Sequence, residues 1–244
     1  MRLRVLLLVA GLFGPALDSS LRADIRTLVL TDDGSQVSQV EIARGGVSGF
    51  TVGWRSADPD GLRIQRFSPD GLPSGPVVQV TDVDLPLVES MAIARDANGY
   101  DLVMWRTSSG FTHVVQRLFV TAFDATGARL FPVVQLAQSS GIDGKVSGYS
   151  AVGGPAGGWI AAWTAYSTGG PGRVYSQRIQ PTSGLVGTPT LLADQGETWT
   201  YLVGLADGGE TLLAAWSSVN PYADTQNDIV GLLIDANGGP IGNT

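Results

Sequence analysis

The segment Gly49-Phe50-Thr51-Val52-Gly53-Trp54 returns three more times along the chain, each time as a short apolar run that ends in tryptophan. Its counterparts are Tyr100–Trp105, Gly158–Trp163 and Leu212–Trp216, so that the four tryptophans follow one another at intervals of 51 to 58 residues. After each tryptophan come a variable loop, a second apolar run and a turn that contains glycine, as at Asp70-Gly71. Repetition at this interval indicates a fold built from similar units.

Each repeat carries the sequence pattern of four short strands. A further apolar run precedes each tryptophan strand, and in the first three repeats another follows the glycine turn. Alternation with a period of two residues, without a sustained helical period, predicts strands, and the Gly, Asn and Asp residues between them are typical of hairpin turns. Four-stranded units at this period predict an all-β fold, a small β-propeller of four antiparallel blades. The predicted units span residues 35–82, 88–138, 146–194 and 198–244.

The last unit reaches the end of the sequence where its fourth strand should begin, and the segment Thr27–Asp32 resembles the fourth strands of the other units. We therefore expect the strand at residues 27–32 to complete the last blade and close the ring, which would remove two exposed sheet edges. The alternative is an open half-ring that pairs with a second copy in a homodimer.

The Gly-Gly-x-x-x-x-Trp pattern, followed by Gln65-Arg66-Phe67 and Gly71-x-Pro73-x-Gly75, resembles the repeats of large bacterial exported and cell-surface proteins with propeller-like folds. The resemblance covers residues 24–244 and implies an extracellular location, with adhesion or association with calcium. The second and fourth repeats lack the Gln-Arg pair in register.

Residues 1–23 have the pattern of a secretory signal: two arginines, the apolar run Val5–Phe13, and then small residues. A buried strand or an uncleaved anchor is the alternative. Cleavage after Ala23 would leave residues 24–244 as the mature propeller domain, without a stable membrane span. We predict a secreted, periplasmic or cell-surface protein of a bacterium.

The composition excludes several kinds of site. The chain has no cysteine and a single histidine, His113, so disulfides, thiolate metal sites and sites with two histidines are impossible. A net charge of −7 with one lysine, Lys145, argues against a nucleic-acid partner. Neither a Gly-x-Ser-x-Gly elbow nor a sialidase Asp box is present, and catalysis by paired carboxylates, as in a glycoside hydrolase or lyase, is less favoured than a binding or structural role.

Acidic residues concentrate in the loops that should share one face of the ring. Carboxylates are suitable ligands for Ca²⁺, and the predicted metal residues are Asp58, Asp60, Asp82 and Asp84. Turns also use Asp for their own geometry, which is the competing interpretation.

Aromatic residues in the loops of the same face suggest a ligand site. Sugar rings stack on aromatic faces while their hydroxyls bind amides and carboxylates. The predicted ligand-binding residues are Phe111, Tyr166, Tyr222, Asp82, Asp143 and Asp194. The four repeat tryptophans are instead expected to fill the wedges between blades. We expect a binding module for a glycan or a cell-surface protein, and the alternative is a structural repeat component of a larger surface assembly.

Overall fold

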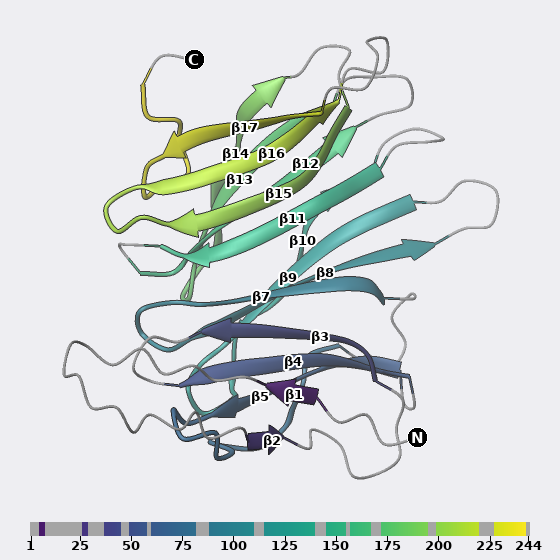
Figure 1. Ribbon diagram of the computed structural model, residues 1–244, viewed down its shortest axis with the longest axis vertical. Helices are drawn as coiled ribbons and strands as arrows, with labels where there is room; N and C mark the ends of the chain where they lie inside the picture. Colours follow the sequence, from purple (N-terminus) through teal and green to yellow (C-terminus); the bar gives the residue numbers. More distant parts are fainter. Residues whose placement is uncertain are drawn as a thin grey trace, which may run out of the picture.

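The computed structural model describes most of the chain as antiparallel strands (Figure 1). The described residues are 5–7, 26–28, 37–44, 49–57, 60–81, 88–109, 115–139, 145–154, 157–166, 172–194, 199–219 and 227–242. No helix among them is long and apolar enough to cross a membrane.

Four of the sheets repeat one order, in which each strand pairs with the next strand along the chain. Sheet 1 contains β3 (Val37–Arg44), β4 (Phe50–Ala57), β5 (Asp60–Phe67) and β6 (Val78–Gln79). Sheet 2 contains β7 (Val88–Arg95), β8 (Asp101–Ser109), β9 (Val115–Phe123) and β10 (Arg129–Gln138). Sheet 3 contains β11 (Lys145–Gly153), β12 (Trp159–Tyr166), β13 (Arg173–Gln180) and β14 (Gly184–Asp194). Sheet 4 contains β15 (Trp199–Asp207), β16 (Leu212–Val219) and β17 (Asn227–Ile234).

The repeat tryptophans Trp54, Trp105, Trp163 and Trp216 lie on the second strands and are almost fully buried, as the sequence predicted. We call the side of each sheet that carries this residue its Trp face, and the other side its plain face. The Trp face of sheet 2 packs on the plain face of sheet 1, where Trp105 and Val103 join Leu62 and Ile64 in one apolar cluster.

The next two interfaces are built in the same way. Trp163 and Ala161 pack with Leu102 and Met104 of sheet 2. Trp216 packs in one cluster with Ile160 and three other buried residues of sheet 3. Burial of apolar side chains between successive sheets is therefore what stacks the four units.

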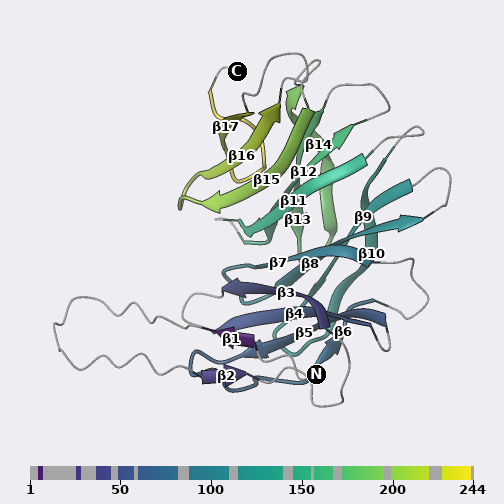
Figure 2. The ribbon, with the colours of Figure 1, turned by 45° about the vertical axis from the view of Figure 1, so that its right-hand side comes forward.

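The first strands of the four sheets lie along the inside of the stack. β3 contacts β7, β7 contacts β11, and β11 contacts β15. In both views β3 and β15 lie on opposite sides of β7 and β11 (Figures 1 and 2). The four sheets thus form an open arc of the β-propeller type.

The predicted closure of the ring is not seen in this structure. Arg26–Leu28, which forms β2, pairs with Val5–Leu7, which forms β1, and the rest of the predicted closing strand lies outside the described residues. Among the described residues, β17 pairs with β16 along its length, and on its other edge it meets only the short segment around Pro240, which bridges to Ile234. The physical reason is competition for a partner, because the apolar strand Val5–Leu7 offers Thr27 and Leu28 a nearby strand edge.

Tight turns join the strands at the end opposite the loops that the sequence singled out. Gly49, which precedes β4, has a φ of +93°, a conformation that favours glycine. A Cβ atom at this position would overlap the carbonyl oxygen of Phe67 on the neighbouring strand β5. Gly158 before β12 meets the same constraint, since a Cβ there would overlap the carbonyl oxygen of Ile179. These two glycines therefore have a steric reason.

The tryptophan wedge yields a prediction about stability. Replacing Trp105, which is fully buried between sheets 1 and 2, with Ala should lower the free energy of unfolding by about 3–5 kcal/mol. Urea denaturation measures this loss. Leu72→Ala is the control, because Leu72 is largely exposed in a turn and its removal should change stability by less than about 0.5 kcal/mol. Similar losses in the two variants would contradict the wedge role of Trp105.

Candidate functional site

The order of the strands places two sets of connections at one end of the sheets. Since consecutive strands are antiparallel, the connections from second to third strands leave at the same end as those from each sheet to the next. We call this the loop end. Tyr166, at the end of β12, and Asp194, at the end of β14, both lie there. Two of the predicted ligand residues are thus placed on the same end of sheet 3.

The other predicted site residues cannot be compared with the structure. Phe111, Tyr222, Asp82, Asp143, Asp58 and Asp84 lie outside the described residues. Asp60 begins β5, and only its backbone is described. Their proposed roles stay predictions.

A row of four residues crosses the loop end of sheet 3. Lys145 pairs with Tyr166 across β11 and β12, and Arg173 pairs with Asp194 across β13 and β14. The Arg173 Nε lies 3.1 Å from the Asp194 Oδ2, and both side chains are substantially exposed. Hydrogen bonding to Asp194 raises the pKa of Arg173. Lys145, Arg173 and Asp194 are exposed, and Tyr166 is half-buried. Because Ala165 pairs with Arg173, the Lys145–Tyr166 pair lies on the opposite face of the sheet from the Arg173–Asp194 pair.

Sheet 2 carries a hydrogen-bonded cluster at the same end. The Glu89 carboxylate accepts hydrogen bonds from Arg106 Nε at 2.8 Å, Ser108 Oγ at 2.5 Å and Gln116 Nε2 at 3.4 Å. Glu89 comes from β7, Arg106 and Ser108 from β8, and Gln116 from β9. Donors from two neighbouring strands hold this carboxylate in one orientation. Sequence reasoning missed the cluster, because its members are scattered over three strands and form no motif.

Two members of the cluster also bind sheet 3. Arg106 Nη1 donates to the carbonyl oxygen of Val146 at 2.9 Å, and the amide of Val146 donates to Gln116 Oε1 at 3.1 Å. These bonds fasten the Glu89 cluster of sheet 2 to the first strand of sheet 3, next to Lys145. We call the Glu89 cluster and the Tyr166 row together the polar rim.

A tyrosine lies deeper between the same two sheets. Tyr149 on β11 donates from its hydroxyl to Ser90 Oγ on β7 at 2.8 Å. Burial raises the pKa of Tyr149 to about 12, although the hydrogen bond to Ser90 opposes this rise. The hydroxyl therefore remains protonated and acts as a donor at neutral pH.

The polar rim has the chemical groups of a binding surface for a polar ligand. Guanidinium, amide and hydroxyl groups donate hydrogen bonds, carboxylates accept them, and Tyr166 offers a ring face. Within the described residues, no group of three or more His, Cys, Asp or Glu residues could hold a metal ion. The calcium site stays a prediction, since most of its residues lie outside the described part of the chain.

Arg66, from the Gln-Arg pair of the first repeat, takes part in a structural contact at the end of the sheets opposite the loop end. Arg66 Nε lies 2.6 Å from Asp101 Oδ2, Arg95 Nε lies 3.2 Å from Asp101 Oδ1, and Thr51 Oγ1 donates to the same carboxylate at 2.9 Å. Burial raises the pKa of Asp101, and the guanidinium groups of Arg66 and Arg95 oppose that rise. The network joins sheets 1 and 2 through buried charges.

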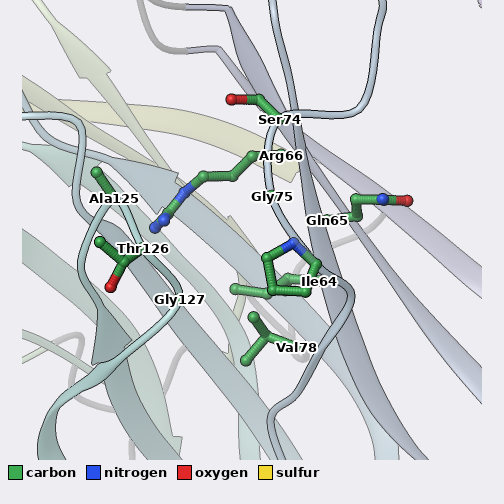
Figure 3. A pocket seen from close by; sticks show the side chains of 10 residues that line it. Ile64, Gln65, Arg66, Ser74, Gly75, Val78, Ala125, Thr126 and Gly127 are labelled. Carbon is green, nitrogen blue, oxygen red and sulfur yellow. The ribbon is translucent and has the colours of Figure 1, made fainter.

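Figure 3 shows Arg66 extending from β5 toward the turn that contains Ala125, Thr126 and Gly127. Its Nη2 donates to the carbonyl oxygen of Phe123 at 3.2 Å. The hollow beside Arg66 measures about 10 Å³, which is space for about one water molecule rather than a ligand. Arg66 is therefore a contact between sheets and not part of a binding site.

A larger cleft runs between sheets 3 and 4. It has a volume of about 550 Å³, in the range of ligand pockets. Its lining is mainly apolar and consists of Leu191, Leu192, Ala193, Asp194, Trp216, Val230, Gly231, Leu232 and Pro240. In sheets 1 to 3 a fourth strand occupies the place beside the third strand. The cleft thus follows the open edge of β17.

Asp101 offers a test of the buried network. Asp101→Asn leaves the Arg66 and Arg95 guanidinium groups buried without a counter-charge, and should lower the free energy of unfolding by about 3–5 kcal/mol. Asp194→Asn, in the exposed pair with Arg173, is the matched control and should cost about 0–1 kcal/mol. Chemical denaturation compares the two variants, and equal small losses would show that the buried charges are not coupled.

The high pKa of Tyr149 predicts a pH dependence. In the unfolded chain a tyrosine ionises near pH 10, whereas folded Tyr149 ionises near pH 12. The folded state therefore holds more protons between these values, and stability should fall as the pH rises from 10 to 12, by about 2–3 kcal/mol in total. Tyr149→Phe should remove this part of the slope in denaturation curves. An unchanged slope would contradict the burial of the hydroxyl.

No protein-family model matches the sequence, and no curated protein matches it. Among solved structures, the chain is similar to a levansucrase of B. megaterium, with a TM-score of 0.52 and 9% identity over 89% of this chain and 70% of that chain. It is also similar to an α-L-arabinanase of Penicillium chrysogenum, with a TM-score of 0.48 and 17% identity over 83% and 58% of the two chains. An endo-arabinase of Bacteroides thetaiotaomicron gives a TM-score of 0.42 and 12% identity over 78% and 74%. At these identities the likeness concerns the fold, which is of the β-propeller type.

Proposed function

We propose that this protein is an exported binding module of the β-propeller type that recognises a glycan through the polar rim. The proposal rests on the hydrogen bonds that fix the Glu89 cluster of sheet 2 to sheet 3. Arg106 and Gln116 fasten the Glu89 cluster of sheet 2 to the backbone of Val146 in sheet 3, beside the Tyr166 row. A fixed surface loses little side-chain entropy when it binds a ligand.

The chemistry of the rim suits a sugar. Hydroxyl groups of a glycan both donate and accept hydrogen bonds, and Glu89, Asp194 and the nearby guanidinium groups supply both functions. Tyr166 adds an aromatic face, on which the C–H side of a sugar ring can stack. The sequence also predicts acidic residues in the connections between the strands that end here.

Export is part of the proposal and rests on the sequence. Two arginines and an apolar run precede residue 24, and the repeats resemble those of bacterial exported and cell-surface proteins. The acidic net charge of −7 agrees with a partner other than nucleic acid.

A glycoside hydrolase requires two carboxyl groups that face one sugar bond, about 5–9.5 Å apart. The described carboxylates of the rim, Glu89 and Asp194, lie on different sheets, and each is engaged by an arginine. Held in this way, they suit recognition better than proton transfer, and binding is the function that we propose.

Binding to an array of bacterial and plant glycans tests the proposal, followed by titration calorimetry on the ligands found. Tyr166→Ala should weaken binding by about fivefold through the loss of stacking, which is worth about 1 kcal/mol. Tyr166→Phe should retain most of the affinity, because the ring remains. Asp194→Asn should also weaken binding.

Asp207→Asn is the control for the acidic substitution. Asp207 is exposed at the opposite end of sheet 4, where it accepts a hydrogen bond from Gly209, and its replacement should leave the affinity unchanged. An array without any bound glycan would refute glycan recognition. Binding that is insensitive to both rim substitutions would place the site elsewhere.

A further inference from the structure

The plain face of sheet 4 is the one plain face of the arc that no following described sheet covers. The plain faces of sheets 1, 2 and 3 each lie under the Trp face of the next sheet. Sheet 4 ends the described arc, so the same face of β16 and β17 meets solvent (Figure 1).

Repeat-equivalent residues show how unusual this face is. Leu62, Leu118, Val174 and Ile229 each pair with the residue that follows the repeat tryptophan. The first three are 0% exposed, whereas Ile229 is 77% exposed. The chain thus keeps a large aliphatic residue at a position that is buried wherever another sheet follows.

Two further positions repeat this contrast. Leu213 is 42% exposed, although its counterparts Thr51, Leu102 and Ile160 are fully buried. Leu233, which pairs with Leu213, is 49% exposed. Ile229, Leu213 and Leu233, with the Ala215–Gly231 pair between them, form what we call the tail face. A contiguous exposed apolar patch of this kind marks an interaction surface.

The other end of the arc, at sheet 1, also has an aliphatic residue that is exposed although its counterparts in the other sheets are packed. Ile42 on β3 corresponds to Ile93, Ala151 and Leu205, which pair with the residue two places before the tryptophan. Those three pack into the clusters between sheets, whereas Ile42 is 43% exposed. Ile42 lies beside the Trp face of sheet 1, and we call this end the head face.

The interface between sheets 1 and 2 shows how closely a plain face and a Trp face pack. A Cβ atom at Gly53 would overlap the side chain of Ile93, so the two residues touch across the first interface. Ala215, which precedes Trp216, corresponds to Gly53. The third interface has an alanine at this position, Ala162, which packs in one cluster with Leu205, the counterpart of Ile42. In a repeat of the third interface, Ala215 of the tail face would meet Ile42 of a head face.

The two faces of one chain cannot meet without a change in the interfaces between its sheets. Three clusters of buried side chains set the angle between successive sheets, and packed interiors resist such repacking. The resulting arc leaves sheets 1 and 4 at opposite ends in both views (Figures 1 and 2). A second copy can supply the head face while every existing interface stays intact.

We propose that the tail face binds the head face of a second copy of this chain, so that two arcs close head to tail into a two-fold symmetric ring. The two interfaces of this dimer are identical, and no unpaired face remains to extend the assembly. Each interface repeats the packing already made three times within one chain.

The docking rests on the export step of the proposed function. Phe50, Val52 and Trp54 on the Trp face of sheet 1 are buried in the full chain, and β1 and β2 lie beside β4 and β5 in both views (Figures 1 and 2). β1 belongs to the segment that we expect to be removed on export. Processing therefore uncovers the head face, and the precursor stays monomeric.

Light scattering on two preparations tests this proposal. The full chain, made without export, should have the monomer mass of 25.5 kDa, and the exported chain about twice the mass of its processed form. Mass spectrometry of the exported chain reports whether residues 1–23 are gone. Retention of these residues would refute the export step, whereas a processed chain that is monomeric at micromolar concentration would refute the docking.

Surface variants identify the face. Ile229→Asp should convert the processed dimer to a monomer without loss of folding, because the side chain is largely exposed in one copy. Leu72→Asp is the control, since Leu72 is a similarly exposed aliphatic residue far along the chain from the tail face, and it should leave the dimer intact. A dimer that survives Ile229→Asp would overturn the proposed surface.

Cross-linking distinguishes a second copy from closure within one chain, and the absence of native cysteines avoids competing cross-links. A mixture of processed Ile42→Cys and Ala215→Cys chains should form a covalent dimer under oxidation or with a short thiol cross-linker. A mixture of Leu72→Cys and Ala215→Cys chains should not. If the double variant Ile42→Cys/Ala215→Cys links only within a monomer, the ring closes within one chain and the dimer is refuted.

Discussion

The structure depends on one repeated contact, in which the tryptophan side of each sheet packs on the plain side of the sheet before it. Trp105, Trp163 and Trp216 each fill such a wedge together with aliphatic residues from both sheets. The contact is non-directional and apolar, so its strength comes from buried area, and its repetition sets the course of the arc. Among the described residues, a buried ion pair, Arg66–Asp101, occurs at the first interface only, because the position of Asp101 is taken by Phe50, Trp159 and Leu212 in the other sheets.

Much of this architecture could be predicted from the sequence, since alternation and the spacing of the tryptophans report local structure. The strands around each tryptophan and the burial of these residues were confirmed. The closing strand was not seen, because several strand edges compete for a short apolar segment and sequence similarity does not rank them. The Glu89 cluster could not be foreseen from residues on three strands, whereas Asp101 left a signal, a charge at a position that is apolar in the other repeats.

The same arrangement links the fold to its proposed uses. Successive antiparallel strands bring variable connections to one end, where the rim of sheets 2 and 3 combines charges, amides and Tyr166 on a rigid support. The stacking that builds this support also leaves the aliphatic residues Leu213, Ile229 and Leu233 on the last sheet without cover. Recognition and assembly therefore use different parts of the molecule, the ends of the strands for a ligand and the face of a sheet for a second copy.

Three repeated interfaces hold the four sheets in an open arc, and the distance between the two ends of that arc can be measured. Spin labels at Ile42 and Leu213 report it, in the full chain after dilution with unlabelled protein. These residues lie on β3 and β16, in the first and last sheets of the arc. An open arc predicts one well-defined long separation within a chain. A short separation, with the labels in contact range, would show that sheets 1 and 4 meet within one chain and would contradict the open arc.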